Sequence, residues 1–200
     1  IFVFVFVFGF LFYTSFMNPE IINSITGNVI KEDVSSGLPI QASLDAPESF
    51  FVDSNMDKLE MKIKGSFIID DKKYDLDSAS IVIDNFDGKI NGDGKKILID
   101  GKSNKIFVQG IPITGKFRVK FNNEYSFLKL GNFYLDSLDY ETSGIVIMKN
   151  DKIVVNLEDE KFSIENFIGD LELTNSNMRL SGFAKKASAG DIMLESNNDV

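Results

Sequence analysis

Carboxylates form the densest groups of side chains in this sequence that could do chemistry. Asp84, Asp87 and Asp93 fall within DNFDGKINGDG, a glycine-rich stretch whose oxygen ligands at short spacing could bind Ca²⁺. The stretch departs from an EF-hand loop, because no glutamate follows at the twelfth position and Lys89 interrupts the ligands. Asp, Asn and Gly are also the residues that form turns between strands, and we favour this second interpretation.

A second acidic group, Glu158 to Glu160, could supply a general acid, but no base accompanies it. The sequence contains no histidine and no cysteine, which excludes imidazole bases, thiol nucleophiles and the usual zinc ligands. No S-x-x-K pattern in a helix would activate a serine, and no glycine-rich loop opens a helix that could hold phosphate. We interpret Glu158 to Glu160 as a solvated turn. We therefore expect neither an enzyme nor a bound cofactor or metal.

Phenylalanine is the more informative residue type. Phe side chains recur throughout the region beyond residue 50, and core packing explains most of them. A sheet that folds over without closing completely would leave some of them lining a groove suited to acyl chains. The candidates for such a ligand-binding groove are Phe107, Phe117, Val119, Phe121, Phe127 and Phe133.

The elements that would position these side chains are indicated by a period of two. In KLEMKIK, residues 58–64, the apolar residues Leu59, Met61 and Ile63 point to one face, and KFRVKF at residues 116–121 repeats the pattern. Further short strands are expected at intervals of about ten residues, with no strong amphipathic helix between them. The groups expected to form turns are Asp70-Asp71, Asp87-Gly88, Asn91 to Gly94, Asp100-Gly101, Asn122-Asn123 and Asn150-Asp151.

This pattern predicts an all-β fold and argues strongly against parallel βαβ folds. A sandwich, a barrel and a β-solenoid all fit the strand spacing. Weak self-similarity among segments such as ILIDGKS and MRLSGFA favours an antiparallel folded sheet, a jelly-roll or a β-taco-like sheet that closes on an apolar interior.

Residues 1–16, IFVFVFVFGFLFYTSF, carry no charge and have the composition of a bilayer-spanning helix. A full span needs about 20 residues, so we expect further residues upstream of Ile1. Two alternatives stay open. The Phe/Val alternation fits a strand covered on both faces, and a short apolar region fits a cleavable signal peptide, although no A-x-A site follows.

We therefore predict an N-terminal transmembrane helix and a single-pass membrane protein. The expected divisions are a transmembrane anchor at residues 1–17, a connector at 18–37 with one strand at Gly27 to Glu32, a β-rich domain at 38–195 and a tail at 196–200. Residues 18–36 carry one lysine, Lys31, so nothing retains this flank in the cytoplasm, and we place the β domain on the extracytoplasmic side of the cell membrane.

Net charge limits the partners of the chain. The formal charge is -9 and the sequence pI is about 4.6, with no basic run. Because this field repels phosphate backbones, we expect no binding of nucleic acid.

An N-terminal anchor followed by many short strands with LSG and IDG endings resembles the extracytoplasmic β-jellyroll proteins of the OstA/LptC kind. The stretch GDLELTNSNMRLSGFA, Gly169 to Ala184, is also similar to segments of AsmA-type repeat proteins. The resemblance covers roughly residues 39–194 and rests on pattern and architecture. It implies an open β-groove that carries lipid acyl chains between membranes, and it carries over no site residue.

We accordingly expect a β domain that binds or conveys lipid or another apolar ligand, alone or as part of an envelope complex. The alternative is a structural or protein-interaction module of a cell-envelope assembly, which adds strands from a neighbour at exposed sheet edges.

Overall fold

The structure, a computed structural model, describes residues 22–24, 37–69, 72–93 and 96–196. Within these residues it forms one antiparallel sheet of nine strands. The strands are β1 (Ile22–Ser24), β2 (Leu38–Asp45), β3 (Ser49–Ile69), β4 (Lys72–Asp93), β5 (Lys96–Val108), β6 (Ile111–Met148), β7 (Ile153–Leu173), β8 (Asn177–Ala189) and β9 (Ile192–Glu195).

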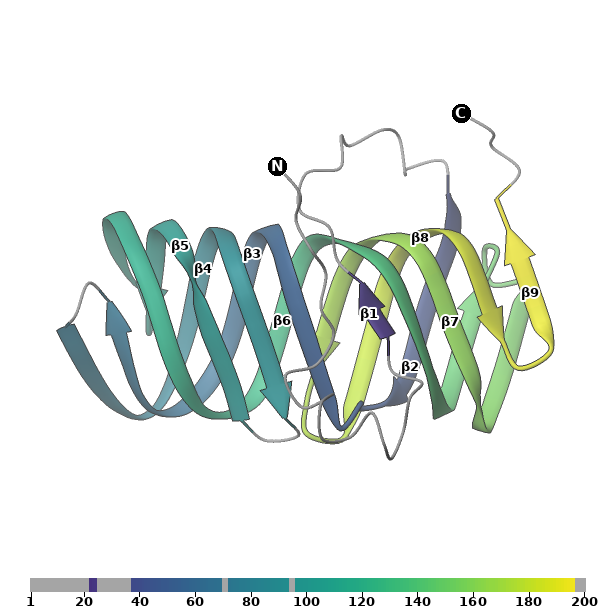
Figure 1. Cartoon of the computed structure of the whole chain (residues 1–200), viewed down its shortest axis with the longest axis horizontal. Coiled ribbons are helices and arrows are strands. Elements are labelled where there is room, and N and C mark those ends of the chain that lie inside the picture. Colours follow the sequence, from purple (N-terminus) through teal and green to yellow (C-terminus); the bar gives the residue numbers. More distant parts are fainter. Residues whose placement is uncertain (1–21, 25–36, 70–71, 94–95, 197–200) are drawn as a thin grey trace.

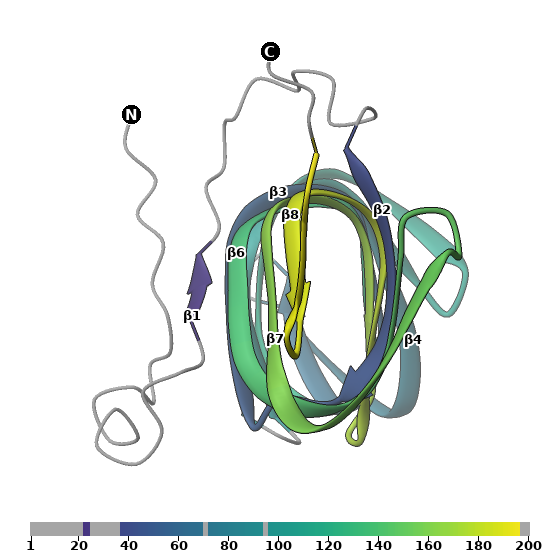
Figure 2. The same cartoon turned by 90° about the vertical axis from the view of Figure 1, so that its right-hand side faces the viewer.

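One strand, β6, closes the sheet on itself. In one half of the molecule β3, β4 and β5 follow one another, and both β3 and β5 also pair with β6. In the other half β7, β8 and β2 follow one another, and both β7 and β2 pair with β6. The sheet is therefore rolled into a long, flattened tube whose strands run around its axis (Figure 1, Figure 2).

Side chains that alternate along the strands fill the inside of this tube. In β2, Leu38, Ile40, Ala42 and Leu44 are buried and the residues between them are more exposed. The buried residues of both halves form one hydrophobic cluster. Successive side chains of a strand point to opposite faces, so the alternation in the sequence becomes an apolar interior and a polar exterior.

Phenylalanine rings pack over pairs of glycines inside the tube. Gly88 of β4 faces Gly101 of β5, and a Cβ atom on Gly101 would lie 2.5 Å from the ring of Phe86. Gly169 of β7 likewise faces Gly182 of β8, under the ring of Phe167. The missing side chains leave room for a ring across two strands, which allows adjacent strands to enclose a bulky core.

An asparagine in the left-handed conformation precedes each of three buried phenylalanine rings, the two over glycine pairs and that of Phe133. Asn85, Asn132 and Asn166 have φ angles of 52°, 51° and 50°. The residues that follow are Phe86, Phe133 and Phe167, each at most 1% exposed. Asn tolerates positive φ better than most residues, and such a residue within a strand changes the strand's direction locally. At Asn132 the pairing of β6 with β7 shifts register.

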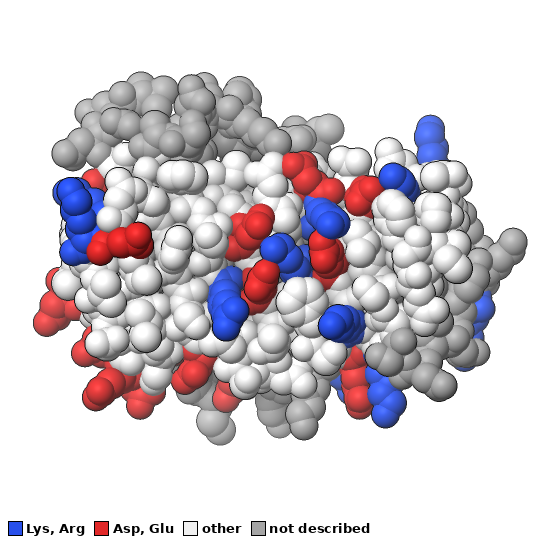
Figure 3. Space-filling view, turned by 180° about the vertical axis from the view of Figure 1, so that it is seen from behind, with Lys and Arg blue, Asp and Glu red and all other residues white. Residues whose placement is uncertain are grey.

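The outer face is held by pairs of opposite charges on neighbouring strands. Lys105 pairs with Asp84 at 3.7 Å, Lys89 with Asp53 at 3.1 Å, and Arg118 with Asp100 at 3.2 Å. On the side opposite to that of Figure 1, cations and carboxylates are interspersed (Figure 3). Such exposed pairs each contribute about 0.2–1 kcal/mol, so they favour register more than stability.

The predicted antiparallel all-β fold is confirmed, but the predicted ladder of short strands is wrong. The segment expected at residues 58–64 lies within the 21 residues of β3, and the segment expected at residues 116–121 lies within the 38 residues of β6. Asp87-Gly88, Asp100-Gly101 and Asn122-Asn123 were predicted as turns but lie inside β4, β5 and β6. The Gly residues among them are paired across strands and make room for a ring, so the chain continues through them.

Other predictions are confirmed or lie outside the described residues. Asn150-Asp151 forms the predicted turn between β6 and β7, with positive φ at both residues. The predicted transmembrane helix at 1–17 and the strand at 27–32 fall outside the described residues. In the part of the chain that the structure describes, no helix is long and apolar enough to cross a membrane.

The glycine pairs lead to a test of the packing. Replacing Gly101→Ala places a Cβ atom 2.5 Å from the ring of Phe86 and 2.7 Å from the Asp87 carbonyl oxygen. Because the backbone atom cannot yield easily, we expect the free energy of unfolding to fall by about 1–3 kcal/mol in urea denaturation. Gly131→Ala is the control, since its nearest neighbours would lie at 3.4 Å. Equal stability of the two variants would contradict this account.

Candidate functional site

The six predicted groove residues divide between the two faces of the sheet. Phe133 and Val119 point inward and are 1% and 2% exposed, and Phe117 packs against the same core while remaining half-buried. Phe107 follows buried Ile106 and lies on the outer face, where the Lys105 ammonium sits 4.6 Å from its ring centre.

Phe127 is also on the outer face, because its neighbour Leu128 is buried and its cross-strand partner is Lys62. Phe121 belongs to β6, and its side chain lies outside what the structure describes. The described members therefore do not line one common surface. Their role in binding a ligand stays a prediction.

The acidic groups singled out in the sequence are dispersed along strands. Asp84 and Asp87 lie within β4, and Asp93 ends that strand, where its Oδ1 accepts a hydrogen bond from the Lys96 amide at 3.2 Å. The turn predicted at Glu158 to Glu160 is wrong, because these residues are part of β7. Among the described residues, no group of three or more Asp or Glu could hold a metal ion.

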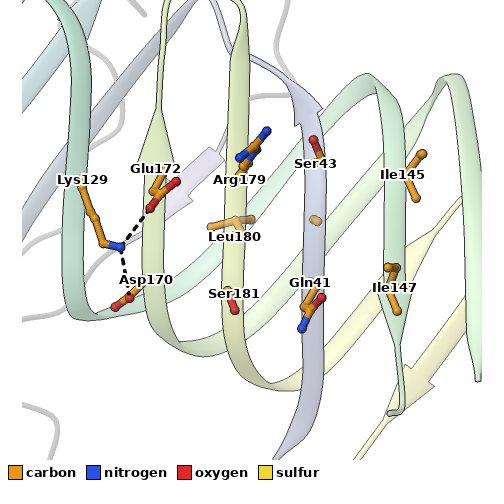
Figure 4. A pocket seen from close by; sticks show the side chains of 11 residues that line it. Gln41, Ser43, Lys129, Ile145, Ile147, Asp170, Glu172, Arg179, Leu180 and Ser181 are labelled. Atoms are coloured by element: carbon orange, nitrogen blue, oxygen red, sulfur yellow. Dashed lines mark hydrogen bonds and ion pairs between the residues drawn. The ribbon is translucent and has the colours of Figure 1, made fainter. Parts of the chain in front are cut away.

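A concave surface lies on the outer face over β6, β7, β8 and β2, and we call it the outer hollow. Its volume is about 580 Å³. Its lining is Gln41, Ala42, Ser43, Lys129, Ile145, Ile147, Asp170, Glu172, Arg179, Leu180 and Ser181 (Figure 4). A volume of this size is in the range of pockets that hold small organic ligands.

Cross-strand register explains why these residues meet. One row across the sheet contains Lys129, Glu172, Arg179, Ser43 and Ile145, each the partner of the next. From β7 to the last segment of β6 this row crosses three strand spacings, which is about 14 Å. The short side chain of Ser43 lies between the longer chains of Arg179 and Ile145, and so leaves the centre of the row low.

A second row runs parallel to the first. It contains Asp170, Ser181, Gln41, Ile147 and Val154, again as successive partners. Ser181 is its short member, Ile147 lies on the apolar side of the hollow, and Val154 of β7 lies next to Ile147, beyond the lining. Ile145 and Val154 are 47% and 59% exposed. The outer hollow thus has a charged side on β6, β7 and β8 and an apolar side on the far segment of β6.

Two cations of the charged side differ in their pairing. The Lys129 ammonium donates to Glu172 at 2.9 Å and lies 3.7 Å from Asp170. The hydrogen bond to Glu172 raises the pKa of Lys129, so this side chain stays protonated at neutral pH. Arg179 is exposed, and in the described part of the chain it forms no ion pair. Its guanidinium is therefore the cation available to a ligand.

A second hollow, of about 520 Å³, lies over β4, β5 and β6 and includes Phe117. It contains Lys102, Lys116 and Arg118, and Arg118 makes bonds of 3.2 Å and 3.3 Å to both carboxylate oxygens of Asp100. Ser103 at its base is 7% exposed and bonds to the Asp84 carbonyl at 2.8 Å, which fixes the irregular pairing there. Arg118 is thus already paired with a carboxylate.

Sequence reasoning missed the residues of the outer hollow because they come from four strands distant in the chain. Ser43, Lys129, Ile145 and Arg179 share no local motif, and only the register of β2, β6, β7 and β8 brings them together. One local signal existed. Ile145 and Ile147 alternate with the buried residues Val146 and Met148, so apolar residues occupy both faces of this strand segment.

Two tyrosines of β6 are buried in the core. Burial raises the pKa of Tyr125 to about 12, and the Asp93 carboxylate adds to this effect. Burial likewise raises the pKa of Tyr140, whose hydroxyl donates to the Asp45 carbonyl oxygen at 3.2 Å. Both rings make edge contacts with phenylalanines, Phe50 and Phe162, at 6.5 Å between ring centres.

Comparisons with protein-family models, with curated proteins and with solved structures found no match to this chain.

The division of the aromatic residues between the two faces can be tested by truncation. Phe133→Ala removes a ring from the interior and should lower the free energy of unfolding by about 3–5 kcal/mol. Phe107→Ala is the matched control, because it removes the same ring from the outer face and should cost less than about 1 kcal/mol. Urea denaturation measures both. Similar losses would show that the assignment of faces is incorrect.

The buried tyrosines predict a loss of stability in alkali. Their folded-state pKa values lie above the unfolded value of 10, so the neutral form is favoured in the folded chain. This contribution is complete below pH 10 and is lost as the pH rises from there through about 12. Urea denaturation over this range should show falling stability, and Tyr125→Phe should make the fall shallower. An unchanged slope in that variant would refute the assignment.

Proposed function

We propose that this chain is a membrane-tethered β domain that binds a phosphate-bearing amphiphile, such as a phospholipid, in the outer hollow. The observation that carries the proposal is the position of the Arg179 guanidinium, which forms no ion pair with any described residue, opposite an exposed apolar surface. Arg179 lies on one side of the hollow, and Ile145 and Ile147 lie on the other. A headgroup phosphate and an acyl chain of one molecule would meet these two sides at the same time.

The chemistry of the two sides suits the two parts of such a ligand. A guanidinium binds phosphate through paired, charge-assisted hydrogen bonds and is less strongly hydrated than an ammonium. Ile145, Ile147 and Val154 form a continuous group of branched side chains on adjacent strand segments. Covering apolar surface of this kind contributes about 25 cal/mol for each Å² removed from water. Ser43, Ser181 and Gln41 lie between, and they can donate to ester or hydroxyl oxygens.

The interior of the tube is a less suitable place for the ligand. Large side chains such as Phe86, Phe133 and Phe167 fill it and are almost fully buried, so a chain entering there would have to displace packed rings. Binding on the outer face requires no such rearrangement. This proposal therefore retains a lipid ligand but moves its site from the predicted groove residues to the outer hollow.

The uncharged segment at residues 1–16 supports a tether to a bilayer, with the β domain on the extracytoplasmic side. A tethered domain stays near the lipid that it binds or conveys.

The proposal is tested by photolabelling the full chain, in detergent, with a phosphatidic acid analogue that carries a photoreactive acyl chain. Mass spectrometry of the digested protein should place the label on the segments around Ile145 and Ile147. Arg179→Gln removes charge-assisted hydrogen bonds of about 1.5–3 kcal/mol, so labelling affinity should fall about tenfold or more. Ile145→Asn should weaken it as well.

Arg118→Gln is the matched control, because it removes an arginine from the other hollow of the outer face. Its labelling should equal that of the unmodified chain. A phosphatidylcholine analogue distinguishes an anionic headgroup from a zwitterionic one. Label distributed elsewhere, or equal affinity of the Arg179 and Arg118 variants, would rule out the outer hollow as the site.

A further inference from the structure

We infer that the ligand of the outer hollow is a phospholipid with two acyl chains, and that its second chain lies on a row of apolar side chains beside the hollow. The inference rests on the proposed function and narrows the class of its ligand. The row crosses β6, β7, β8 and β2, and it consists of the successive cross-strand partners Tyr134, Ile168, Phe183 and Pro39. We call it the apolar row.

The apolar row lies on the outer face of the sheet. Phe183 is 38% exposed, whereas the next residue, Ala184, is buried in the tube. Ile168 likewise follows the buried Phe167 and is half-buried on the outer face. Both faces of β7 and β8 are therefore apolar at this point. An antiparallel sheet with one face in water normally carries polar residues on that face, so this row indicates a surface that another molecule covers.

The apolar row adjoins the lining of the outer hollow. Ser181 precedes Phe183 by two positions on β8, and Gln41 follows Pro39 by two positions on β2, so each pair points to the same face. Ser181 and Gln41 line the hollow (Figure 4). Positions two residues apart in a strand are separated by about 6.5 Å. A ligand in the hollow can therefore reach the apolar row across a single short step.

The composition of the row suits a hydrocarbon chain. The two rows of the hollow carry charges, such as those of Glu172 and Asp170, but the four members of the apolar row are uncharged. Its one polar side-chain group, the hydroxyl of Tyr134, donates a hydrogen bond to the side chain of Asn166. Covering this row with methylene groups therefore leaves no hydroxyl without a partner, and burying a polar group is costly only when it lacks one.

The position of the cation favours two chains over one. Along the tube, Arg179 on β8 lies between two apolar surfaces. Ile145 lies in one direction, beyond β2, on the last segment of β6. Phe183 lies on β8 itself, and Ile168 and Tyr134 continue from it in the opposite direction. A single chain that leaves a phosphate at Arg179 covers only one of these surfaces, whereas the two chains of one lipid cover both.

The test photolabels the full chain, in detergent, with two isomers of a phosphatidic acid analogue that carry the photoreactive group on one acyl chain or on the other. One isomer should label the segment around Ile145 and Ile147, as in the test of the proposed function. The other isomer should label the segments around Ile168 and Phe183. A lysophosphatidic acid analogue with a single photoreactive chain should bind about tenfold more weakly, because it leaves the apolar row uncovered.

A substitution in the row should discriminate between the two kinds of ligand. Phe183→Ser should lower the affinity for the two-chain analogue about fivefold and that for the one-chain analogue less than about twofold. Ile168→Ser should act in the same direction. Phe107→Ser is the matched control, because it removes a ring from the outer face of the other half of the tube and should leave both affinities unchanged. Urea denaturation verifies that each variant is folded.

Failure of this inference can be recognised separately from failure of the proposed function. Absence of label around Ile145, or labelling that does not depend on Arg179, would overturn both. Labelling that depends on Arg179 but falls on the same segment with both isomers would overturn the two-chain ligand alone. An equal effect of Phe183→Ser on the one-chain and two-chain analogues would have the same consequence.

Discussion

The structure depends on backbone pairing along both edges of β6. This strand is the neighbour of β3 and β5 in one half and of β7 and β2 in the other, so it converts two short runs of strands into one closed sheet. Closure removes most unpaired edges, which would otherwise favour aggregation. It also places an apolar face entirely inside, where it loses contact with water.

Closure of so narrow a tube requires that bulky residues and close-packed strands coexist. Phe86 and Phe167 achieve this by lying over glycine pairs, and Asn85 and Asn166 redirect the strand immediately before each ring. The same combination of asparagine and phenylalanine occurs at Phe133 in β6. At these three sites, large rings fill the interior with close packing. The same side chains therefore stabilise the tube and determine its shape. A ligand is accordingly more easily accommodated on the outside than within.

The outer face of the sheet is not uniformly polar. Exposed isoleucine and valine lie beside a row of alternating charges, and short serines between them produce a concavity. This combination of a charged side and an apolar side is the basis of the proposed amphiphile site.

The sequence by itself determined the fold class, the alternation of inward and outward side chains, and the absence of imidazole and thiol chemistry. These properties are local or compositional: a period of two sets the face of each residue, whatever strand lies beside it. Strand length, closure and the outer hollow were decided by the tertiary structure. Asp87-Gly88 and Asp100-Gly101 have the composition of turns, yet cross-strand pairing carries the chain through them. Arg179 and Ile145 likewise meet only through the register of β2 with both β8 and β6, a long-range property that no local pattern records.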